Sequence, residues 1–256
     1  MLARCASIWH DAFMTDRIHC FPEPEALVQA AVADFLALLD ACEGECHVAL
    51  AGGNTPRRFY AALAQAGAGR DWSAVHFWFG DERAVPPDHP DSNFRMARET
   101  LFAPLGIAAG RIHPMPIPDP VLPVSLDAAA RDYEAELRRH LPETDDGWPR
   151  FDLVLLGMGE DGHTASLFPG TAALDETRRA VVPVHVANRN AWRLTLTLPV
   201  LNAASHVWVM VTGAAKAPAL RRARSRLDPP LPVQRVQPPG GRDWFVDAAA
   251  MGGACP

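Results

Sequence analysis

The residues best suited to chemistry are Asp161 and His163, which lie two positions apart in the chain. A carboxylate this close to an imidazole can orient the ring and stabilise its protonated form, as a general base requires. The run Phe151–Leu156 before them is apolar without alternation, which predicts a parallel strand covered on both faces. Gly157 and Gly159 allow a sharp turn at the carboxyl end of that strand, where open α/β sheets bind ligands.

The segment Gly157–Gly162 also matches G-x-G-x-x-G, the pattern of dinucleotide-binding turns. That pattern should open a long helix and be followed, about twenty residues later, by an acidic residue. Pro169 interrupts such a helix, and Arg178 and Arg179 stand where the acidic residue should be. We therefore expect no dinucleotide, and the sequence indicates no other cofactor.

A second candidate site is the loop Gly52-Gly53-Asn54-Thr55, between an expected strand at His47–Ala51 and an expected helix at Arg57–Gln65. A glycine loop that opens a helix presents backbone amides to an anion, and Asn54 and Thr55 add side-chain donors. The alternative is an ordinary connection in which Thr55 caps the helix. Because no Walker lysine follows, both interpretations stay open.

Three charged residues, Asp81, Glu82 and Arg83, follow the expected strand Val75–Phe79. Packing alone explains such a group poorly at the end of a strand, although a solvated loop cluster is the alternative. Arg83 could bind an anion while Asp81 or Glu82 holds the guanidinium in place. The group therefore indicates a binding site.

Lys216 lies in the first turn of a helix expected after the strand His206–Val211 and Thr212-Gly213. It is the only lysine among 24 basic residues. A compact ammonium suits a cramped phosphate site better than a rigid guanidinium does. Survival by chance is the alternative explanation.

Composition sets the remaining bounds. With 256 residues, 48% of them hydrophobic and 21% charged, the chain has the size and composition of one large α/β domain or two closely joined ones. No clear boundary divides it, so we expect a single α/β domain over residues 1–256. A formal charge of -6 argues against a nucleic-acid partner. The N-terminal residues lack a signal-type apolar core, and no apolar run is long enough to span a membrane. We expect a cytoplasmic protein with a small-molecule ligand and no membrane contact.

The other expected elements follow from periodicity and turn residues. They are helices at Glu25–Asp40, Asn93–Leu101 and Leu126–His140, a strand or hairpin in residues 1–20, and strands at Arg111–Met115, Val181–Val186, Arg193–Leu198 and Trp244–Val246. The five cysteines form no C-x-x-C pair and are expected to be reduced thiols. Structural or surface roles are expected for His47, His76, His113, His185 and His206, so no metal site is predicted.

Taken together, these motifs resemble the 6-phosphogluconolactonases, which share the fold of glucosamine-6-phosphate deaminases, ribose-5-phosphate isomerases and CoA transferases. The resemblance covers nearly the whole chain in order. It rests on Leu50-Ala-Gly-Gly-Asn-Thr-Pro56, Trp78-Phe-Gly-Asp-Glu-Arg83, His89-Pro-Asp-Ser-Asn93, the segment Leu156–Pro169, and Val211-Thr-Gly213 with Lys216. It implies a Rossmann-like, mostly parallel sheet with helices on both faces, in a monomer or small homo-oligomer.

The resemblance also implies hydrolysis of 6-phospho-D-glucono-1,5-lactone, the second step of the oxidative pentose phosphate pathway. His163 would activate water without a metal and Asp161 would orient it. Substrate binding would fall to Asp81, Arg83, Lys216 and the 52–55 loop. The family often has Ser where this chain has Ala51, which removes one possible hydroxyl donor.

Two alternatives remain. A deaminase has a glutamate five residues after the histidine and a tyrosine after the acidic pair, whereas this chain has Phe168 and Arg83 there. A regulator that binds sugar phosphate without catalysis would need neither Asp161 nor His163.

Overall fold

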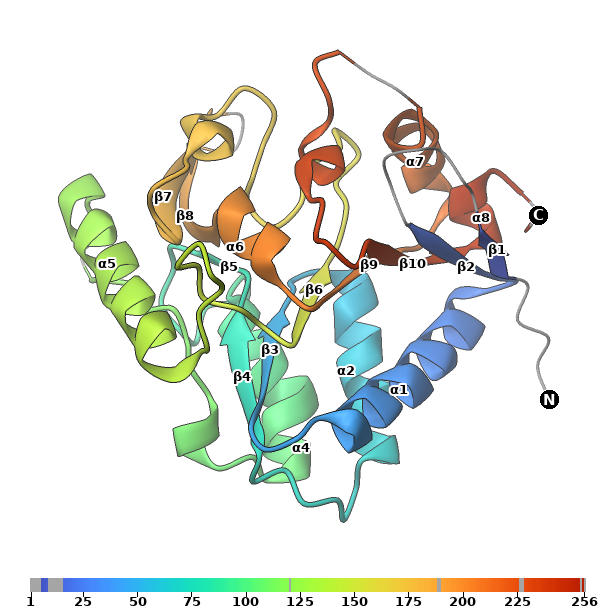
Figure 1. The fold of residues 1–256 in the computed structure, drawn as a ribbon, viewed down its shortest axis with the longest axis horizontal. Coiled ribbons are helices and arrows are strands. Elements are labelled where there is room, and N and C mark those ends of the chain that lie inside the picture. The colour runs from blue at the N-terminus through green and yellow to red at the C-terminus, as the bar shows by residue number, and fades with distance from the viewer. Residues whose placement is uncertain are drawn as a thin grey trace.

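The structure of the protein is a computed structural model that describes residues 6–8, 16–119, 121–187, 190–225, 228–253 and 255. Its larger sheet contains the strands β1 (Ala6–Ile8), β2 (Arg17–Phe21), β3 (Cys46–Leu50), β4 (Val75–Phe79), β6 (Leu153–Leu156), β9 (His206–Val211) and β10 (Arg242–Asp247). Their order is β1-β2-β10-β9-β6-β3-β4 (Figure 1). Only β1 pairs antiparallel with its neighbour, so the expected mostly parallel sheet is confirmed.

Helices cover both faces of this sheet. The helices are α1 (Pro24–Ala41), α2 (Asn54–Ala66), α3 (Asn93–Ala97), α4 (Ala103–Leu105), α5 (Pro123–His140), α6 (Leu198–Ala203), α7 (Ala217–Ala223) and α8 (Ala248–Met251). A π-helical turn, η1 (Arg98–Phe102), joins α3 to α4, and 3-10 turns lie at η2 (Ala109–Arg111), η3 (Ala172–Asp175), η5 (Ala214–Lys216) and η6 (Pro232–Arg235). In Figure 1, α1 and α2 lie together on one side of β9 and β10, and α7 lies on the other side.

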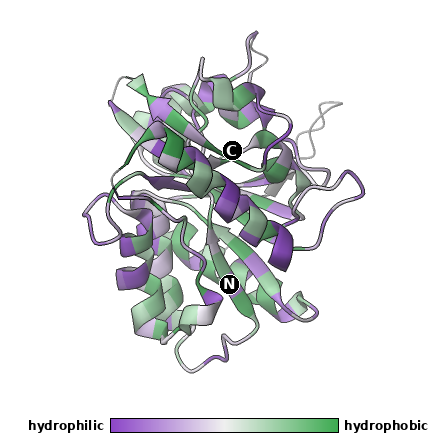
Figure 2. Ribbon diagram, turned by 90° about the vertical axis from the view of Figure 1, so that its left-hand side faces the viewer, coloured by the Kyte–Doolittle hydropathy of each residue, from purple (hydrophilic) through white to green (hydrophobic). Residues whose placement is uncertain are grey.

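The central strands form the middle of the core. Every residue of β3, β4 and β6 is buried, and Figure 2 shows these strands mostly as hydrophobic segments between more polar helices. A strand covered on both faces has no solvent side to require polar residues. This explains why Leu153–Leu156 has no alternating pattern.

A second, antiparallel sheet of three strands has the order β5-β8-β7, with β5 at Asp81–Arg83, β8 at Ala191–Leu196 and β7 at Val181–Val186. Its register places Asp81 opposite Thr195 and Arg83 opposite Arg193. Directly opposed side chains lie on the same face of a sheet, as do side chains two positions apart in one strand. One face of this sheet therefore collects all four residues.

Several expected elements differ from the structure. No strand forms at Arg111–Met115: the chain makes the turn η2 and then only an isolated bridge between Ile112 and Phe77. The helix with Lys216 is divided into η5 and α7, because Pro218 lacks the N–H needed to continue a regular helix from the preceding turn. Part of the expected N-terminal strand or hairpin lies outside the described residues, namely 1–5 and 9–15.

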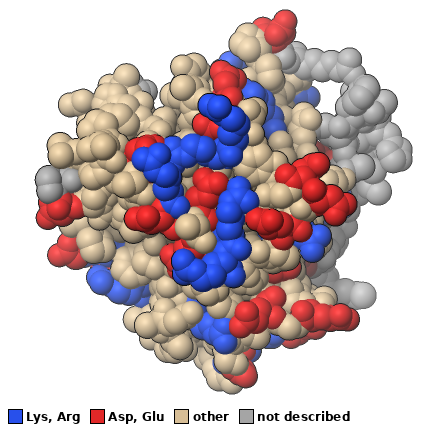
Figure 3. Space-filling model, turned by 60° about the vertical axis from the view of Figure 1, so that its left-hand side comes forward, with Lys and Arg blue, Asp and Glu red and all other residues tan. Residues whose placement is uncertain are grey.

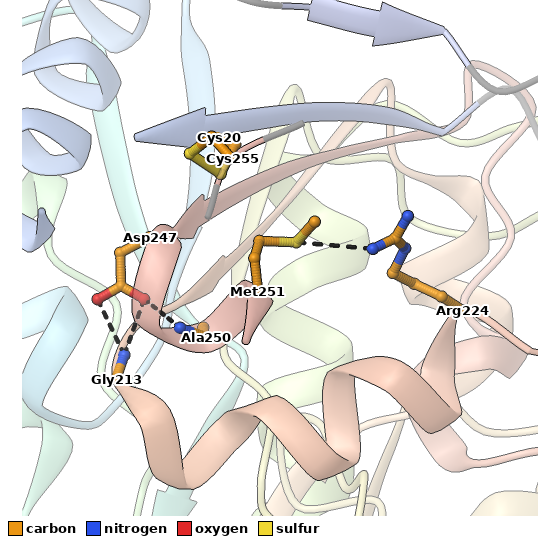
Figure 4. Close-up of a disulfide and its surroundings, with 7 residues drawn as sticks. All are labelled: Cys20, Gly213, Arg224, Asp247, Ala250, Met251 and Cys255. Carbon is orange, nitrogen blue, oxygen red and sulfur yellow. Dashed lines mark hydrogen bonds between the residues drawn. A yellow bond between two sulfur atoms is a disulfide. The ribbon is translucent and has the colours of Figure 1, made fainter. Parts of the chain in front are cut away.

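The expectation that all cysteines are reduced is wrong. Cys20 in β2 and Cys255 form a disulfide, with Cα atoms 5.5 Å apart (Figure 4). The two cysteines are 235 residues apart, so their spacing along the chain gave no sign of the pairing. Only the fold brings Cys255 next to β2. Cys42 and Cys46 are free thiols.

None of the helices in the described part of the chain is both long and apolar enough to cross a membrane.

Candidate active site

Three candidate segments lie at one edge of the larger sheet. They are the 52–55 loop after β3, residues 157–163 after β6 and residues 212–216 after β9. In the sheet, β6 lies between β3 and β9, so the segment with His163 is flanked by the other two. Thr55 Oγ1 and Thr212 Oγ1 are hydrogen-bonded at 2.7 Å, which joins the two flanking loops directly. The fold thus brings these predicted segments together.

His163 and Asp161 form the expected pair. Nδ1 of His163 lies 2.5 Å from Asp161 Oδ1, and the same oxygen accepts from the His163 backbone N–H at 3.1 Å. The His163 side chain retains 20% exposure, so it is accessible to a small molecule. Because Nδ1 faces the carboxylate, Nε2 is the nitrogen available to a water.

Two glycines make this pairing possible. A Cβ atom on Gly159 would lie 2.0 Å from His163 Nδ1 and 2.6 Å from Asp161 Oδ1, so only glycine leaves room for the pair. Gly162 has a φ of +82°, in the left-handed region that favours glycine. The segment continues as turns and an isolated bridge up to Phe168, which confirms that G-x-G-x-x-G here does not open a helix.

Burial lowers the pKa of His163 below its ordinary value, while the hydrogen bond and charge of Asp161 oppose this shift without cancelling it. Burial acts to raise the pKa of Asp161, but the hydrogen bonds from His163 outweigh it and leave that pKa lowered. At neutral pH the ring is therefore neutral and the carboxylate is charged. A neutral imidazole with an anionic partner can accept a proton.

An aromatic ring supports the other side of His163. The ring of Phe168 stacks on the imidazole with centroids 4.2 Å apart. The guanidinium of Arg193 lies 5.6 Å from the Phe168 ring centroid. Phe168 stands at the position where a deaminase has glutamate, and here it provides a stacking surface for His163.

Asp81 is buried and already engaged by neighbouring residues. It accepts from Ser166 Oγ at 2.5 Å and from Asn93 Nδ2 at 3.2 Å, and Arg193 Nη1 lies 3.6 Å away. Its negative charge also acts to raise the pKa of His163. The structure places Asp81 next to the candidate base, in a position to organise the site.

Within the described residues, the Glu82 carboxylate accepts hydrogen bonds from residues 83 and 92–94, and none of them comes from the guanidinium of Arg83. It accepts from the backbone N–H groups of Arg83, Asn93 and Phe94 at 2.7 to 2.8 Å and from the Ser92 hydroxyl at 3.1 Å. Burial raises its pKa, and those N–H donors oppose the shift. The adjacent acidic residues therefore have separate roles.

Arg83 donates from Nη1 to the backbone carbonyl of Asp91 at 2.5 Å. Within the described residues it forms no hydrogen bond or ion pair with Lys216 or with the 52–55 loop. It lies instead opposite Arg193 in the small sheet. Like charges directly opposed across strands are unfavourable, so an anion bound between these two residues would relieve that repulsion.

The 52–55 loop has the form expected of an anion site. Gly53 has a φ of +108° and precedes the 13-residue helix α2, whose amino end carries a partial positive charge. No side chain caps this helix, so the alternative role of Thr55 as a cap is wrong. The loop also packs closely on Asn93, since a Cβ on Gly52 would lie 2.1 Å from Asn93 Oδ1.

Lys216 lies half-buried in η5. Gly213, with a φ of +93°, begins this turn, and both carboxylate oxygens of Asp247 accept from its N–H at 3.0 Å (Figure 4). In the described part of the chain Lys216 has no ion-pair partner. The ammonium therefore has no local carboxylate to satisfy it.

Sequence reasoning missed Arg193, Ser166 and Asn93 as members of this site. Arg193 is 6% exposed within a mostly apolar strand, and a charged residue in such a strand is a usable signal. Ser166 and Asn93 lie inside the recognised motifs, but their contact with Asp81 depends on the tertiary fold.

Charge on the face that includes α5 and the small sheet is mixed. Figure 3 shows basic and acidic side chains interspersed there, without a broad basic surface. Two arginines of α5 are paired with carboxylates of the same helix, Arg138 with Glu134 at 3.1 Å and Arg131 with Asp127 at 2.5 Å.

Comparison with known proteins agrees with this arrangement. The sequence model of the glucosamine-6-phosphate isomerases/6-phosphogluconolactonase family matches residues 22–245. A Nostoc sp. protein named 6-phosphogluconolactonase is 40% identical over 242 residues, which cover 93% of this chain and 98% of that protein. The structure of a 6-phosphogluconolactonase from Trypanosoma cruzi is 28% identical with a TM-score of 0.85, and the match covers 96% of this chain and 100% of that chain.

A monomeric glucosamine-6-phosphate deaminase has a TM-score of 0.74 at 19% identity, covering 91% of this chain and 98% of that one, and so shares the fold. The family match spans most of the chain and includes all the candidate segments described above. This chain is an enzyme of the glucosamine-6-phosphate isomerase/6-phosphogluconolactonase family.

Proposed function

We propose that this protein hydrolyses 6-phospho-D-glucono-1,5-lactone to 6-phosphogluconate, the second step of the oxidative pentose phosphate pathway. The observation that carries the proposal is the His163–Asp161 pair, at 2.5 Å, between two loops suited to anion binding. The Nostoc and Trypanosoma cruzi relatives carry the name of this activity.

In the proposed mechanism, Nε2 of His163 takes a proton from water, and the hydroxide forms a bond to the lactone carbonyl carbon. The tetrahedral intermediate then breaks its bond to the ring oxygen. The imidazolium returns the proton to that oxygen as it leaves, which regenerates the neutral base. Asp161 stabilises the transient imidazolium. These steps balance with His163 alone, so the mechanism needs no metal.

The 6-phosphate would be bound by the 52–55 loop and Lys216, with Arg83 and Arg193 as further cations. Thr55 and Thr212 join the loops that bear these donors. Binding energy from the phosphate would align the carbonyl with the water next to His163, which raises the rate of attack. A phosphorylated sugar is retained inside cells by its charge, and we place the enzyme in the cytoplasm on that ground.

The test is acid release from freshly prepared 6-phosphogluconolactone, measured above spontaneous hydrolysis. We expect His163→Asn to keep the fold and to lose roughly 100-fold or more in turnover, as is typical for loss of a general base. A near wild-type rate in that variant would refute the mechanism.

Ammonia release from glucosamine-6-phosphate tests the deaminase alternative. Deamination with isomerisation needs several proton transfers, and stacked Phe168 supplies no acid or base. We expect no release at about 1 mM substrate, the upper end of common KM values. Enzyme-dependent ammonia would favour the deaminase.

A further inference from the structure

A cluster of imidazoles lies at the opposite end of the sheet from the candidate active site. His47 and His76 are the second residues of β3 and β4, whereas the 52–55 loop follows the carboxyl end of β3. Next to them lie His113, Glu136 and His140, whose potential ligand atoms are all within 4.8 Å of one another. The proposed hydrolysis uses none of these residues.

We propose that His113, Glu136 and His140 bind one divalent transition metal ion, with Zn²⁺ as the natural occupant. Two imidazoles and one carboxylate form a ligand set that zinc accepts, with a water in the fourth position. This differs from the sequence-based expectation of a purely structural role for His113.

The three ligands come from two segments that the fold holds together. Glu136 and His140 are four residues apart in the last turns of α5, so they lie on the same side of the helix. His113 follows η2, and its backbone N–H donates to the carbonyl of Phe77 at 2.9 Å. A metal would therefore connect the end of α5 to the segment beside β4.

Ring packing orients both imidazoles before any metal binds. The indole of Trp78 stacks on His113 with centroids 3.8 Å apart and planes 7° from parallel. His140 is exposed, yet its ring lies 5.0 Å from that of His113 and 5.7 Å from that of Trp78. A turn of the exposed His140 side chain would aim a nitrogen at a shared ion.

The distances fit an ion that enters between the ligands. With metal–nitrogen bonds of about 2.0 Å, neighbouring ligand atoms of a tetrahedral site are about 3.3 Å apart. His113 Nδ1 and Glu136 Oε1 are now 2.7 Å apart and hydrogen-bonded, so they would separate slightly. His140, on the exposed side of the cluster, would move inward and leave the fourth position to water.

A hydrogen-bond chain behind His113 accommodates the metal. Without an ion, Arg111 donates to His76 Nε2, His76 Nδ1–H donates to His113 Nε2 at 2.9 Å, and His113 Nδ1–H donates to Glu136. With an ion on His113 Nδ1, its Nε2–H donates back to His76 Nδ1. His76 Nε2–H then donates to Glu45, whose Oε1 is 3.2 Å away.

Both arrangements keep the two imidazoles neutral. In the second, Arg111 must turn away from His76 Nε2–H, because both groups are donors, and keep only its pair with Glu45. The second matches a common feature of metal sites, in which a ligating histidine donates its other N–H to a neighbouring acceptor. Arg111 lies beyond His76 and is paired with Glu45 at 2.6 Å, so its charge is offset. This series of hydrogen bonds therefore leaves His113 Nδ1 available as a metal ligand without creating a buried charge.

Two other places could bind the same ion and must be separated from this one. Cys42 Sγ and Cys46 Sγ are 2.9 Å apart, and thiolates bind Zn²⁺. His163 and Asp161 offer an imidazole and a carboxylate in the candidate active site. The matched controls are therefore Cys42→Ser, His163→Asn, and His206→Ala, which removes an exposed histidine outside the cluster.

The experiment measures Zn²⁺ affinity of the tag-free full chain by competition with a chromophoric chelator, and the visible spectrum after Co²⁺ replacement. We expect one equivalent of Zn²⁺ and a Co²⁺ spectrum of nitrogen and oxygen ligands without a thiolate charge-transfer band. His140→Ala and Glu136→Gln should each weaken binding at least as much as the 10–100-fold loss typical of outer-shell changes. The three controls should bind as wild type does.

Glu136→Gln keeps an acceptor for His113, and His140 is exposed, so neither variant should unfold the protein. Thermal unfolding of each metal-free variant checks this directly. Unchanged affinity in His140→Ala, loss of binding in Cys42→Ser or His163→Asn, or no binding by wild type would each overturn the proposal. Lactone hydrolysis is measured separately, so failure of this site leaves the proposed function untouched.

Discussion

A Cβ atom on Gly159 would lie 2.0 Å from Nδ1 of His163. The glycine therefore does more than allow a turn, because its missing side chain is the space in which the imidazole and its carboxylate meet. A methyl group there must displace the ring, since the contact is far shorter than side chains tolerate.

We expect Gly159→Ala to lower kcat by roughly 100-fold, the scale of loss from misplacing a catalytic group by about 1 Å. Folding should survive, because the His163 side chain is partly exposed and can move. Gly157→Ala is the matched control: its Cβ would meet nothing within 4 Å. Steady-state kinetics of both variants with circular dichroism checks this. Equal activity of the two variants would contradict it.

The dependence of rate on pH should report His163. Its pKa is lowered by burial, and its neutral form is the base, so kcat/KM should be level at neutral pH and fall only as the pH drops through that lowered pKa. In Asp161→Asn the carboxylate no longer supports the imidazolium. The pKa of His163 then falls further, which moves the acidic limb to lower pH while the plateau rate decreases.

A profile of Asp161→Asn with its acidic limb unmoved or shifted to higher pH would show that another group controls the rate. Asp161→Glu serves as the control, since it restores the charge at a different length.

Lys216 and Arg83 should affect only the phosphorylated substrate. Each charge-assisted contact is worth about 1.5–3 kcal/mol, so either alanine variant should lower kcat/KM for 6-phosphogluconolactone by roughly 10–100-fold. Unphosphorylated gluconolactone does not use the phosphate site and should be affected much less. The quantity to measure is the ratio of the two kcat/KM values. General damage to the catalytic centre lowers both values and therefore cancels in the ratio.

Arg150→Ala is a suitable control, since this exposed arginine precedes β6 at the end away from His163. Lys216→Arg distinguishes a compact phosphate ligand, which arginine replaces poorly, from a surface charge that either residue can supply. Equal loss on both lactones in Lys216→Ala would remove Lys216 from the phosphate site.

The Cys20–Cys255 disulfide should stabilise the folded protein. Crosslinking residues 235 positions apart restricts the unfolded chain, and the chain-entropy estimate for so long a loop is up to about 5 kcal/mol. We expect Cys255→Ser to lower the free energy of unfolding by up to this amount, and reductant to bring wild type to the same value. Cys42→Ser should leave the effect of reductant intact.

Peptide mapping after thiol labelling without reductant tests the bond itself. Cys42 and Cys46 should be labelled in the unfolded protein, and Cys20 and Cys255 only after reduction. Labelling of all four without reductant would show that they are not paired.

The sequence predicted the features that depend on neighbouring residues. The apolar runs before Gly52 and Gly157 identified two strands, and the lack of alternation before Gly157 identified a strand buried on both faces. The closeness of Asp161 to His163 identified the pair that the structure forms. Arg111–Met115 failed as a strand because a short stretch with apolar residues does not specify a pairing partner.

Features that depend on distant residues could not be predicted in the same way. β5 has only three residues, and its identity as a strand comes from pairing with β8. The proximity of Arg193 to Asp81 follows from that register. The carboxylate of Glu136 and the ring of His140 meet His113 only because α5 lies beside β4.

The bond between Cys20 and Cys255 also changes what a break in the backbone would do. Between these residues the covalent chain is a closed ring, so a protease that cuts once inside it opens the ring without releasing a fragment. The pieces would separate on a denaturing gel only after reduction. A nicked molecule would keep all three loops around His163 tethered, at an effective concentration that favours their reassembly.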